Sequence, residues 1–362
     1  MIGFCLAAGA GSRLAPLTRV VPKPLLAPAG RPLLDLAVEA LLAAGVARVV
    51  VNAHHGAEQL AAHLAGRPAV RLVREPVLLG TGGGLANAAR LGLLGDGDDP
   101  VVVTCADHVV DPADLAALAA SLQELDAPMV VGLVPSAAAT FGLRLEGSPA
   151  GARPPRGGRL SAGGGRPGGG QPGGGRPGGE WGAAGRVVRD PEGPWDSAGA
   201  YALRAGVLQD LRPVPSTLDA AVLGPLLDRG ELAGLPFRGP VADAGTLHRL
   251  LGASAGLLDG RWPYDLPTGA LLTRPWHGRT MPPVLVAAGA TCHEAATVAG
   301  PVVLDAGSRV EAGAVVTRAL IGPGAAVGAG ARVVGSVLGP GAVLAPGETA
   351  VAALLPGPPP LG

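Results

Sequence analysis

The sequence predicts an α/β protein: a doubly wound, mostly parallel Rossmann-like sheet followed by a short C-terminal left-handed parallel β-helix. Over residues 1–255, strand-like apolar segments alternate with helical patterns, which is typical of a parallel sheet with helices on both faces. Nearer the C-terminus, apolar residues recur every six positions, the period of a parallel β-helix. We expect a first domain over 1–255, a linker over 256–280, a hexapeptide-repeat domain over 281–355 and a Pro-rich tail over 356–362.

The first domain has strand patterns at 2–6, 48–52, 70–73, 101–104 and 129–134. Apolar residues at helical spacing predict helices at 32–44, 57–64 and 113–125, and a further helix is expected at 247–254. Asp111 precedes Pro112 and is expected to cap the third helix. Ligands of such sheets bind beyond the carboxyl ends of the strands, where a Gly-rich turn and Asp107 both fall.

A Gly-, Pro- and Arg-rich insert interrupts this domain at 147–185. Of its 39 residues, 17 are Gly, and its centre repeats Gly-Gly-Gly-Arg/Gln-Pro. Such a composition buries too little apolar surface to offset the entropy of ordering, so we expect a flexible surface loop. Its net positive charge leaves contact with an anionic partner as an alternative.

The six-residue period defines the C-terminal domain. Apolar residues lead the units at Val298, Leu304, Val310, Val316, Ile321, Val327, Val333, Leu338 and Leu344. A small residue, mostly Gly, follows three places after most of them. Each unit supplies one short strand and one corner, so nine units predict about three turns of a triangular coil. Its apolar faces predict a homo-oligomer.

Composition excludes several classes of protein. The 362-residue chain has 28 basic and 28 acidic residues and nine aromatic ones, which argues against nucleic-acid binding. Three widely spaced cysteines without a Cys-x-x-Cys pair argue against disulfides or a thiolate zinc cluster and favour a reducing cytoplasm. Apolar stretches are broken before they reach membrane-spanning length, and the N-terminus lacks the basic region of a signal peptide.

The strongest chemical signal is the turn after the first strand, Gly9-Ala10-Gly11-Ser12-Arg13, with Lys23 ten residues further on. Glycines let backbone N–H groups converge on phosphate oxygens. Arg13 can donate to two of those oxygens at once, and Lys23 adds a point charge. The pattern predicts a triphosphate site; an ordinary turn with scattered basic residues is the alternative.

These residues resemble the sugar-1-phosphate nucleotidyltransferases, also called nucleotide-sugar pyrophosphorylases. The resemblance covers most of residues 1–255 outside the insert and implies that Ala8, Gly9, Gly11, Ser12, Arg13 and Lys23 bind the nucleotide. The family's Leu-Gly-Thr-x-Gly motif, preceded by an acidic residue, stands here at 79–83 after Glu75. It implies that Gly80, Thr81 and Gly83 line the base and ribose pocket.

Two aspartates are expected to hold Mg²⁺, the one cofactor that the resemblance implies. Asp107 ends Cys105-Ala106-Asp107, where the family has Asn-Gly-Asp, and Asp243 opens Asp243-Ala244-Gly245-Thr246. Two carboxylates from separate strand ends suit a hard cation held against phosphate oxygens. For either aspartate alone, a cap or turn role is the alternative. Arg13, Lys23 and Asp107 are the expected catalytic residues.

On the sugar side, the resemblance implies roles for Glu192 and Gly199. Gly193 stands where the family's Glu-Lys-Pro motif has the lysine that holds the sugar phosphate. Arg189, Arg238 or an arginine of the insert are candidate replacements. We expect structural roles for His54 and His55.

The resemblance implies transfer of a nucleoside monophosphate from an NTP to a sugar 1-phosphate, giving NDP-sugar and pyrophosphate. The loop, the Leu-Gly-Thr-Gly motif and the short coil are most similar to mannose-1-phosphate guanylyltransferases, which predicts GTP and mannose 1-phosphate as substrates. Glucose-1-phosphate uridylyl-, thymidylyl- and adenylyltransferases are alternatives. A non-catalytic regulatory paralogue that binds nucleotide-sugar, and a hexapeptide scaffold for assembly, also stay open.

Overall fold

The computed structural model describes the chain except for a few segments; the described residues are 1–135, 142–146, 183–267, 269–272, 275–276, 279–280 and 282–359, with side chains described outside 268–281. The predicted flexible insert at 147–185 lies almost entirely outside them. Within the described residues, no helix is long and apolar enough to cross a membrane.

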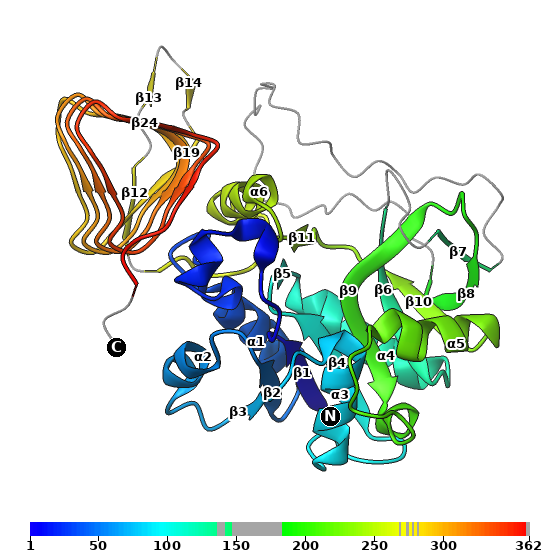
Figure 1. Cartoon of the computed structure of the whole chain (residues 1–362). Coiled ribbons are helices and arrows are strands. Elements are labelled where there is room, and N and C mark those ends of the chain that lie inside the picture. The colour runs from blue at the N-terminus through cyan, green and yellow to red at the C-terminus, as the bar shows by residue number, and fades with distance from the viewer. Residues whose placement is uncertain are drawn as a thin grey trace.

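The first part of the chain is built on a nine-stranded sheet in the order β3-β2-β1-β4-β9-β6-β10-β8-β7 (Figure 1). Its strands are β1 Ile2–Leu6, β2 Val49–Ala53, β3 Val70–Arg74, β4 Pro100–Cys105, β6 Met129–Pro135, β7 Leu143–Leu145, β8 Gly185–Arg189, β9 Trp195–Arg204 and β10 Leu232–Pro236. The strands predicted at 2–6, 48–52, 70–73, 101–104 and 129–134 are all present.

The sheet is mixed, which corrects the expectation of a mostly parallel one. Strands β3, β2, β1 and β4 are parallel, as are β6 and β10. The long strand β9 lies between β4 and β6 and is antiparallel to both. Strands β7 and β8 extend the antiparallel half. The parallel half was predictable from strand–helix alternation, whereas the place of β9 depends on pairing between distant segments.

Helices cover both faces of the sheet, as a doubly wound fold requires. One face packs on α1 Leu33–Ala43, α2 Ala57–Leu64 and α4 Pro112–Glu124, and the other on α3 Gly80–Arg90, α5 Gly224–Asp228 and the short helices η4 Ala205–Leu208 and η5 Asp219–Leu223. Alternate strand residues serve the two layers: Cys5 packs with the first and Phe4 with the second. Asp111 caps α4, because its Oδ1 accepts from the Ala113 N–H at 2.9 Å.

Helix α3 was not predicted, because its first five residues are Gly-Thr-Gly-Gly-Gly, a poor helix-forming sequence. The predicted helix at 247–254 is α6 Leu247–Leu258, which begins after the N-cap Thr246. Three short 3₁₀ turns, η1 Ser12–Leu14, η2 Leu17–Arg19 and η3 Lys23–Leu25, shape the segment after β1. A two-stranded ribbon pairs β5 His108–Val109 with β11 Ala242–Asp243.

The C-terminal part is a coil of short parallel strands that stack in ladders, seen end-on in Figure 1 as a triangle. Its strands are β15 Val284–Ala287, β16 Thr291–Cys292, β17 Thr297–Leu304, β18 Arg309–Val310, β19 Val315–Ile321, β20 Ala326–Val327, β21 Arg332–Val334, β22 Val337–Leu338, β23 Val343–Leu344, β24 Thr349–Val351 and β25 Leu354–Leu355. The apolar leaders stack in register, as Leu304 on Ile321 and Ile321 on Leu338. The left-handed β-helix stays a prediction.

The coil is longer than the three turns expected. One ladder runs β15–β17–β19–β22–β25 and so extends beyond both the first and the last predicted leader. The linker also contributes: β12 Gly269–Leu272 adds an antiparallel edge to β15, and β13 Pro275–Trp276 pairs with β14 Arg279–Thr280. Glycines at corners such as Gly307 and Gly324 have positive φ (66° and 65°), which explains the glycine of the repeat.

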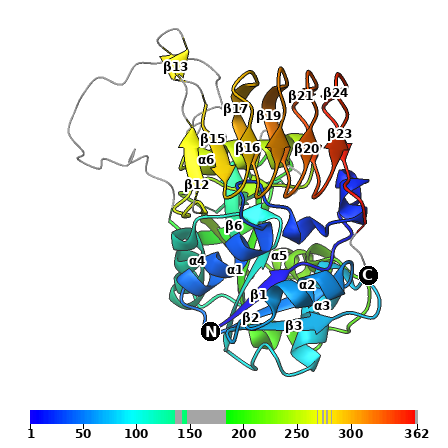
Figure 2. The same cartoon turned by 90° about the vertical axis from the view of Figure 1, so that its left-hand side faces the viewer.

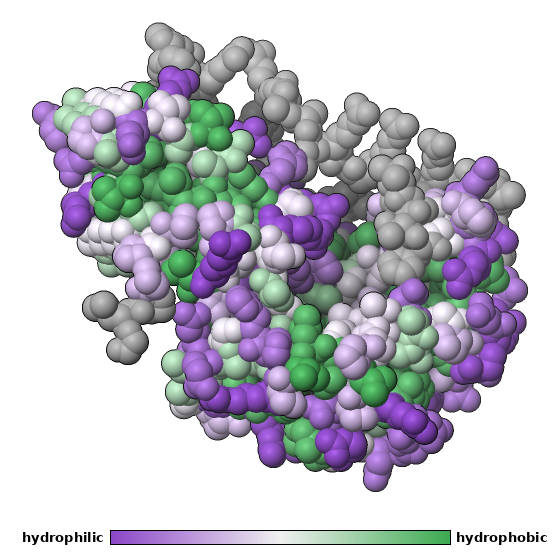
Figure 3. All heavy atoms as spheres, in the orientation of Figure 1, coloured by the Kyte–Doolittle hydropathy of each residue, from purple (hydrophilic) through white to green (hydrophobic). Residues whose placement is uncertain are grey.

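One outward face of the coil packs on the first domain, as Figure 2 shows beside α6. Leu285, Val303, Leu320 and Val337 share a buried cluster with residues of α6 and with Leu17. Before the coil, the Trp262 indole N–H donates to the Pro240 carbonyl at 2.7 Å. Figure 3 shows apolar surface on the end of the coil that faces the viewer. In the last turn of the coil, Val343 and Val351 are 72% and 61% exposed. The homo-oligomer stays a prediction.

Candidate active site

The Gly-rich turn leaves β1 with its glycines in two different environments. Ala8 is buried, whereas Gly9 is exposed and a Cβ there would meet no atom within 4 Å, so the space beside it is open to a ligand. Gly11 has φ +62°, and a Cβ there would lie 2.9 Å from the Lys23 Cβ. Ser12 and Arg13 are exposed. The turn therefore crosses closely over Lys23 and presents its polar side chains outward.

Lys23 and Asp107, 84 residues apart, form an ion pair at the end of β4. Lys23 is 8% exposed, so its charge is held in a fixed place. Burial alone would raise the pKa of Asp107, but His108, Lys23 and the hydrogen bonds lower it below its ordinary value. Asp107 is therefore an ionised carboxylate at neutral pH.

The β5–β11 ribbon brings the second predicted aspartate to the same place. Asp243 lies opposite His108 in the pairing, and the Ala244 N–H donates to the Asp107 carbonyl at 2.8 Å. Asp243 accepts from the Gly245 N–H at 2.6 Å through Oδ1 and pairs with Arg249 through Oδ2. The Arg13 guanidinium lies over Gly245, because a Cβ there would be 2.7 Å from an Arg13 nitrogen. Arg13, Lys23, Asp107 and Asp243 thus gather at one edge of the sheet.

This donor set fits Mg²⁺ in its chemistry. Mg²⁺ prefers carboxylate oxygens and is bound through one or two of them together with substrate phosphates. Asp107 and Asp243 supply such oxygens from adjoining backbone segments. In the structure, the positive charge beside each carboxylate comes from a side chain: Lys23 pairs with Asp107 and Arg249 pairs with Asp243.

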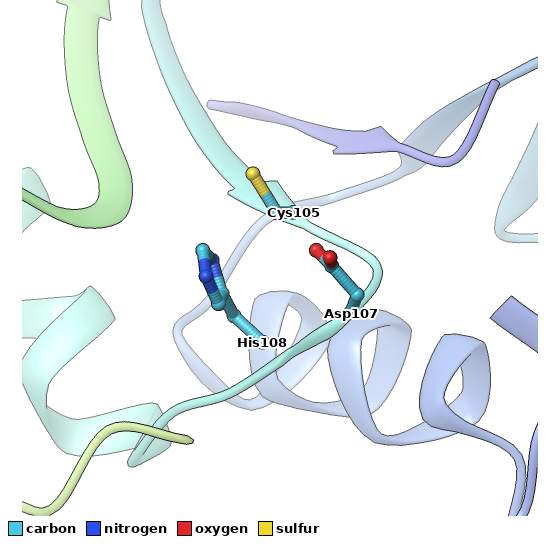
Figure 4. A group of neighbouring side chains, drawn as sticks. All are labelled: Cys105, Asp107 and His108. Carbon is cyan, nitrogen blue, oxygen red and sulfur yellow. The ribbon is translucent and has the colours of Figure 1, made fainter. Parts of the chain in front are cut away.

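His108 is a residue of this site that sequence reasoning missed. Its ring packs against Gly199 so closely that any Cβ at Gly199 would collide with it, which explains the glycine at φ +69°. Cys105, Asp107 and His108 face one another around the turn from β4 to β5 (Figure 4). Burial raises the pKa of the Cys105 thiol well above its usual range. The one feature of the sequence that could have indicated this group is that a cysteine, an aspartate and a histidine fall within four consecutive residues.

A buried hydrogen-bond network holds the start of the Gly-rich turn in place through the Ala7 N–H. The Asn52 side chain accepts from the Ala7 N–H and donates to Glu75, both at 2.7 Å. Glu75 in turn accepts from the Leu79 N–H at 3.2 Å, just before α3. The two histidines that follow β2 also bond to backbone: His54 to the Glu75 carbonyl at 2.8 Å and His55 to the Thr18 carbonyl at 2.9 Å.

The glycines of the Leu-Gly-Thr-Gly-Gly-Gly motif allow α3 to approach residues 214–218. A Cβ at Gly83 would lie 3.0 Å from the Val214 carbonyl carbon, and one at Gly82 would lie 2.7 Å from the Thr217 oxygen. The Thr81 hydroxyl accepts from the Leu218 N–H at 2.7 Å. Gly83 is buried, whereas Gly80 and Thr81 are half-buried at the start of the helix. Close packing therefore accounts for Gly83 without a ligand.

Gly193 lies in the turn between β8 and β9, where its N–H donates to the Asp190 carbonyl at 2.7 Å. A Cβ there would lie 2.6 Å from the Leu143 carbonyl carbon, so this turn excludes the family's lysine on steric grounds. Glu192 is exposed on the same turn. Of the candidate replacements, Arg189 pairs with Asp228 at 3.7 Å through its side chain. Arg238 is held through its backbone, because its main-chain N–H donates to Asp114 on α4 at 3.0 Å. The arginines of the insert lie outside the described residues.

The sequence profile of the family described as Nucleotidyl transferase matches residues 2–143. That range holds the Gly-rich turn, Lys23, the Gly-Thr-Gly motif and Asp107. Residues 2–143 are therefore similar to the nucleotidyl transferase family, and the match spans less than half of the chain.

Among individual proteins, the chain is similar to the N-acetylmuramate alpha-1-phosphate uridylyltransferase of Caulobacter vibrioides, with 42% identity over 115 residues, 30% of this chain and 46% of that one. It is 36% identical over 116 residues to the mannose-1-phosphate guanylyltransferase catalytic subunit beta of Danio rerio, 31% of this chain and 32% of that one. The chain thus spans less than half the length of these relatives. A crystal structure of UDP-glucose pyrophosphorylase complexed with UDP-glucose has the same fold, with TM-score 0.51 and 18% identity over 71% of this chain and 98% of that one.

Proposed function

We propose that this chain is a sugar-1-phosphate nucleotidyltransferase, which transfers a nucleoside monophosphate from an NTP to a sugar 1-phosphate and releases pyrophosphate. The observation that supports this most is the gathering of Arg13, Lys23, Asp107 and Asp243 at the carboxyl edge of the sheet. Two cations suit a triphosphate, and two carboxylates suit the metal ion that accompanies it.

In this proposal the open space beside Gly9 takes the phosphates of the NTP. Arg13 is exposed, lies over Gly245 and pairs with no carboxylate in the described part of the chain, so its guanidinium can donate to two phosphate oxygens. Lys23 sits below the turn and stabilises the negative charge of the leaving pyrophosphate. Asp107 and Asp243 would hold Mg²⁺, which neutralises charge on the phosphate oxygens when bound.

The acceptor needs no general base. A sugar 1-phosphate has a second pKa near ~6 and is mostly a dianion at neutral pH, so its oxygen is already a nucleophile. The chain's task is to align that oxygen with the α-phosphorus for in-line attack and to neutralise charge. His108 lies beside Asp107 and its ring packs on Gly199, and in this proposal the two residues limit the room for the acceptor.

For the substrates we propose GTP and mannose 1-phosphate, because the Danio rerio relative is a mannose-1-phosphate guanylyltransferase. The C-terminal coil of stacked strands, for which the sequence predicts a left-handed β-helix of hexapeptide repeats, supports the same choice. A second pair is UTP with an N-acetylmuramate-type 1-phosphate. The Caulobacter vibrioides relative, with the higher identity, favours it. The steric exclusion of lysine at Gly193 favours an acceptor whose phosphate is held by other cations.

The experiment measures pyrophosphate release by the purified full-length chain and its Asp107→Asn variant, with Asp98→Asn as the matched control. The Asp98 side chain is 86% exposed, and its ion-pair partner in the described part of the chain is Arg204, away from the site. We expect Asp107→Asn to lower turnover at least about 100-fold, a loss typical of removing a preorganised charge, while Asp98→Asn stays near the wild-type rate. Nucleotide-sugar binding without turnover in the unmodified chain would instead favour the regulatory alternative.

A further inference from the structure

One turn of the chain carries three different metal-ligating side chains. Cys105 ends β4, Asp107 lies in the turn and His108 begins β5. The Cys105 Sγ, an Asp107 carboxylate oxygen and a His108 ring nitrogen all lie within 4.8 Å of one another. Among the described residues this is the one group of three or more His, Cys, Asp or Glu side chains that meets this distance. In Figure 4 the three side chains surround a common space.

The imidazole of His108 supplies an independent reason to look for a ligand. Its Nδ1 is buried and has no hydrogen-bond partner among the residues that the structure describes. The ring cannot easily turn away, because it packs against Gly199 and its backbone is held in the β5–β11 ribbon. Buried polar atoms in folded proteins nearly always have a partner. A bound ion would provide one for this nitrogen.

We propose that Cys105, Asp107 and His108 form a binding site for a thiophilic divalent cation of the zinc class. Sulfur, imidazole nitrogen and carboxylate oxygen are together the donors that Zn²⁺ and Co²⁺ take, whereas Mg²⁺ takes oxygen. Tetrahedral bonds of ~2.0–2.3 Å place neighbouring donors roughly 3.3–3.8 Å apart, so no pair of the three atoms needs to close by more than about 1.5 Å. A water molecule completes the tetrahedron.

Binding changes two existing bonds. The ion takes Cys105 as the thiolate, and the thiol proton passes to the buffer. It also replaces the Lys23 ammonium as the positive charge beside Asp107. Because Asp107 is the carboxylate proposed to hold Mg²⁺, the two ions compete for it, so zinc should inhibit nucleotidyl transfer; this consequence, unlike the binding itself, rests on the proposed function.

The test is a Co²⁺ titration of the tag-free, full-length chain after removal of metal with a chelator. We expect one equivalent to bind, with a sulfur-to-cobalt charge-transfer band and the intense visible bands of tetrahedral Co²⁺, and we expect Zn²⁺ to displace it. Cys105→Ser should abolish the charge-transfer band. His108→Ala should weaken Co²⁺ binding at least roughly 10–100-fold, because even second-shell losses cost that much.

The matched control is Cys292→Ser, which removes a cysteine that is also followed by a histidine, His293, but lies in the coil. It should leave the cobalt spectrum and affinity unchanged. Circular dichroism checks that each variant is folded. Because Cys105→Ser and His108→Ala are separate variants, one of them still tests the site if the other does not fold. The proposal is overturned if the wild-type chain gives no charge-transfer band, or if the band survives in Cys105→Ser. If the wild-type chain binds Co²⁺ as expected but releases no pyrophosphate, the result would count against the proposed function and not against the metal site.

Discussion

Asn52 is the residue whose removal should disturb the Gly-rich turn most directly. It is 2% exposed, and its amide joins the Ala7 N–H on one side to Glu75 on the other, both at 2.7 Å. Asn52→Ala leaves the buried Ala7 N–H without an acceptor, at about 1–3 kcal/mol, and takes a donor from a buried carboxylate, at about 1.5–3 kcal/mol. The free energy of unfolding should therefore fall by about 3–5 kcal/mol.

The assay is urea denaturation followed by circular dichroism. Asn87→Ala is the matched control, because Asn87 is the other asparagine of the chain, is also buried and takes no part in this network. Its change should stay below about 1.5 kcal/mol, since alanine is the better helix former in α3. A loss below about 1 kcal/mol in Asn52→Ala would refute the importance of the network.

A paired substitution tests the polarity of the same contact. Asn52→Asp keeps an acceptor for the Ala7 N–H but sets a carboxylate against Glu75, so it should also destabilise the fold. Adding Glu75→Gln restores an amide opposite the new carboxylate and should recover part of the loss. The contact assignment is wrong if the double variant is no more stable than Asn52→Asp alone.

Three further predictions follow from the site and the coil. Gly193→Lys should destabilise the fold and should not lower the KM for sugar phosphate, because a Cβ there would lie 2.6 Å from the Leu143 carbonyl carbon; a lower KM would contradict the steric reading. The pKa of Asp107 is lowered in the folded chain, so the contribution of this carboxylate to stability is present above its ordinary pKa of 3.8 and is lost as pH falls through the folded pKa. Urea denaturation from pH 7 to pH 2 should therefore show that the difference in free energy of unfolding between wild type and Lys23→Met narrows below about pH 4. A difference that stays constant over this range would argue against the ion pair. Leu320→Ala should cost about 2–5 kcal/mol because Leu320 is buried against the first domain, while Val343→Ala, 72% exposed on the same coil, should leave the urea midpoint unchanged; equal effects would mean that the coil does not dock through this face.

Local patterns predicted most of the elements but not how the sheet is completed. The first strand at 2–6 and the helix at 57–64 have the expected bounds, because each has a clear apolar period and a turn signal beside it. Helix α3 was missed, since its glycines are explained only by the nearby backbone of residues 214–218. The antiparallel place of β9 likewise depends on a pairing between segments about 100 residues apart.

The candidate site was predictable to a similar extent. The resemblance brought out Arg13, Lys23, Asp107 and Asp243 one by one, but no sequence feature indicated that Lys23 pairs with Asp107 or that Arg13 lies over Gly245. His108 was missed because its importance comes from a missing hydrogen-bond partner, which only a folded chain can reveal. The sequence showed that Gly193 stands where the family has a lysine, and the structure adds the steric reason why a side chain does not fit there.

Asp107 and its neighbours at the carboxyl edge of the sheet are the proposed site of nucleotidyl transfer. The most direct measurement is Mg²⁺-dependent pyrophosphate release over a grid of GTP, UTP, dTTP, ATP and CTP against mannose-, glucose-, galactose-, N-acetylglucosamine- and N-acetylmuramate 1-phosphates. We predict one strong combination, GTP with mannose 1-phosphate, that disappears in Asp107→Asn. A blank grid from a folded, nucleotide-binding chain, or a strong combination that survives Asp107→Asn, would contradict nucleotidyl transfer at this site.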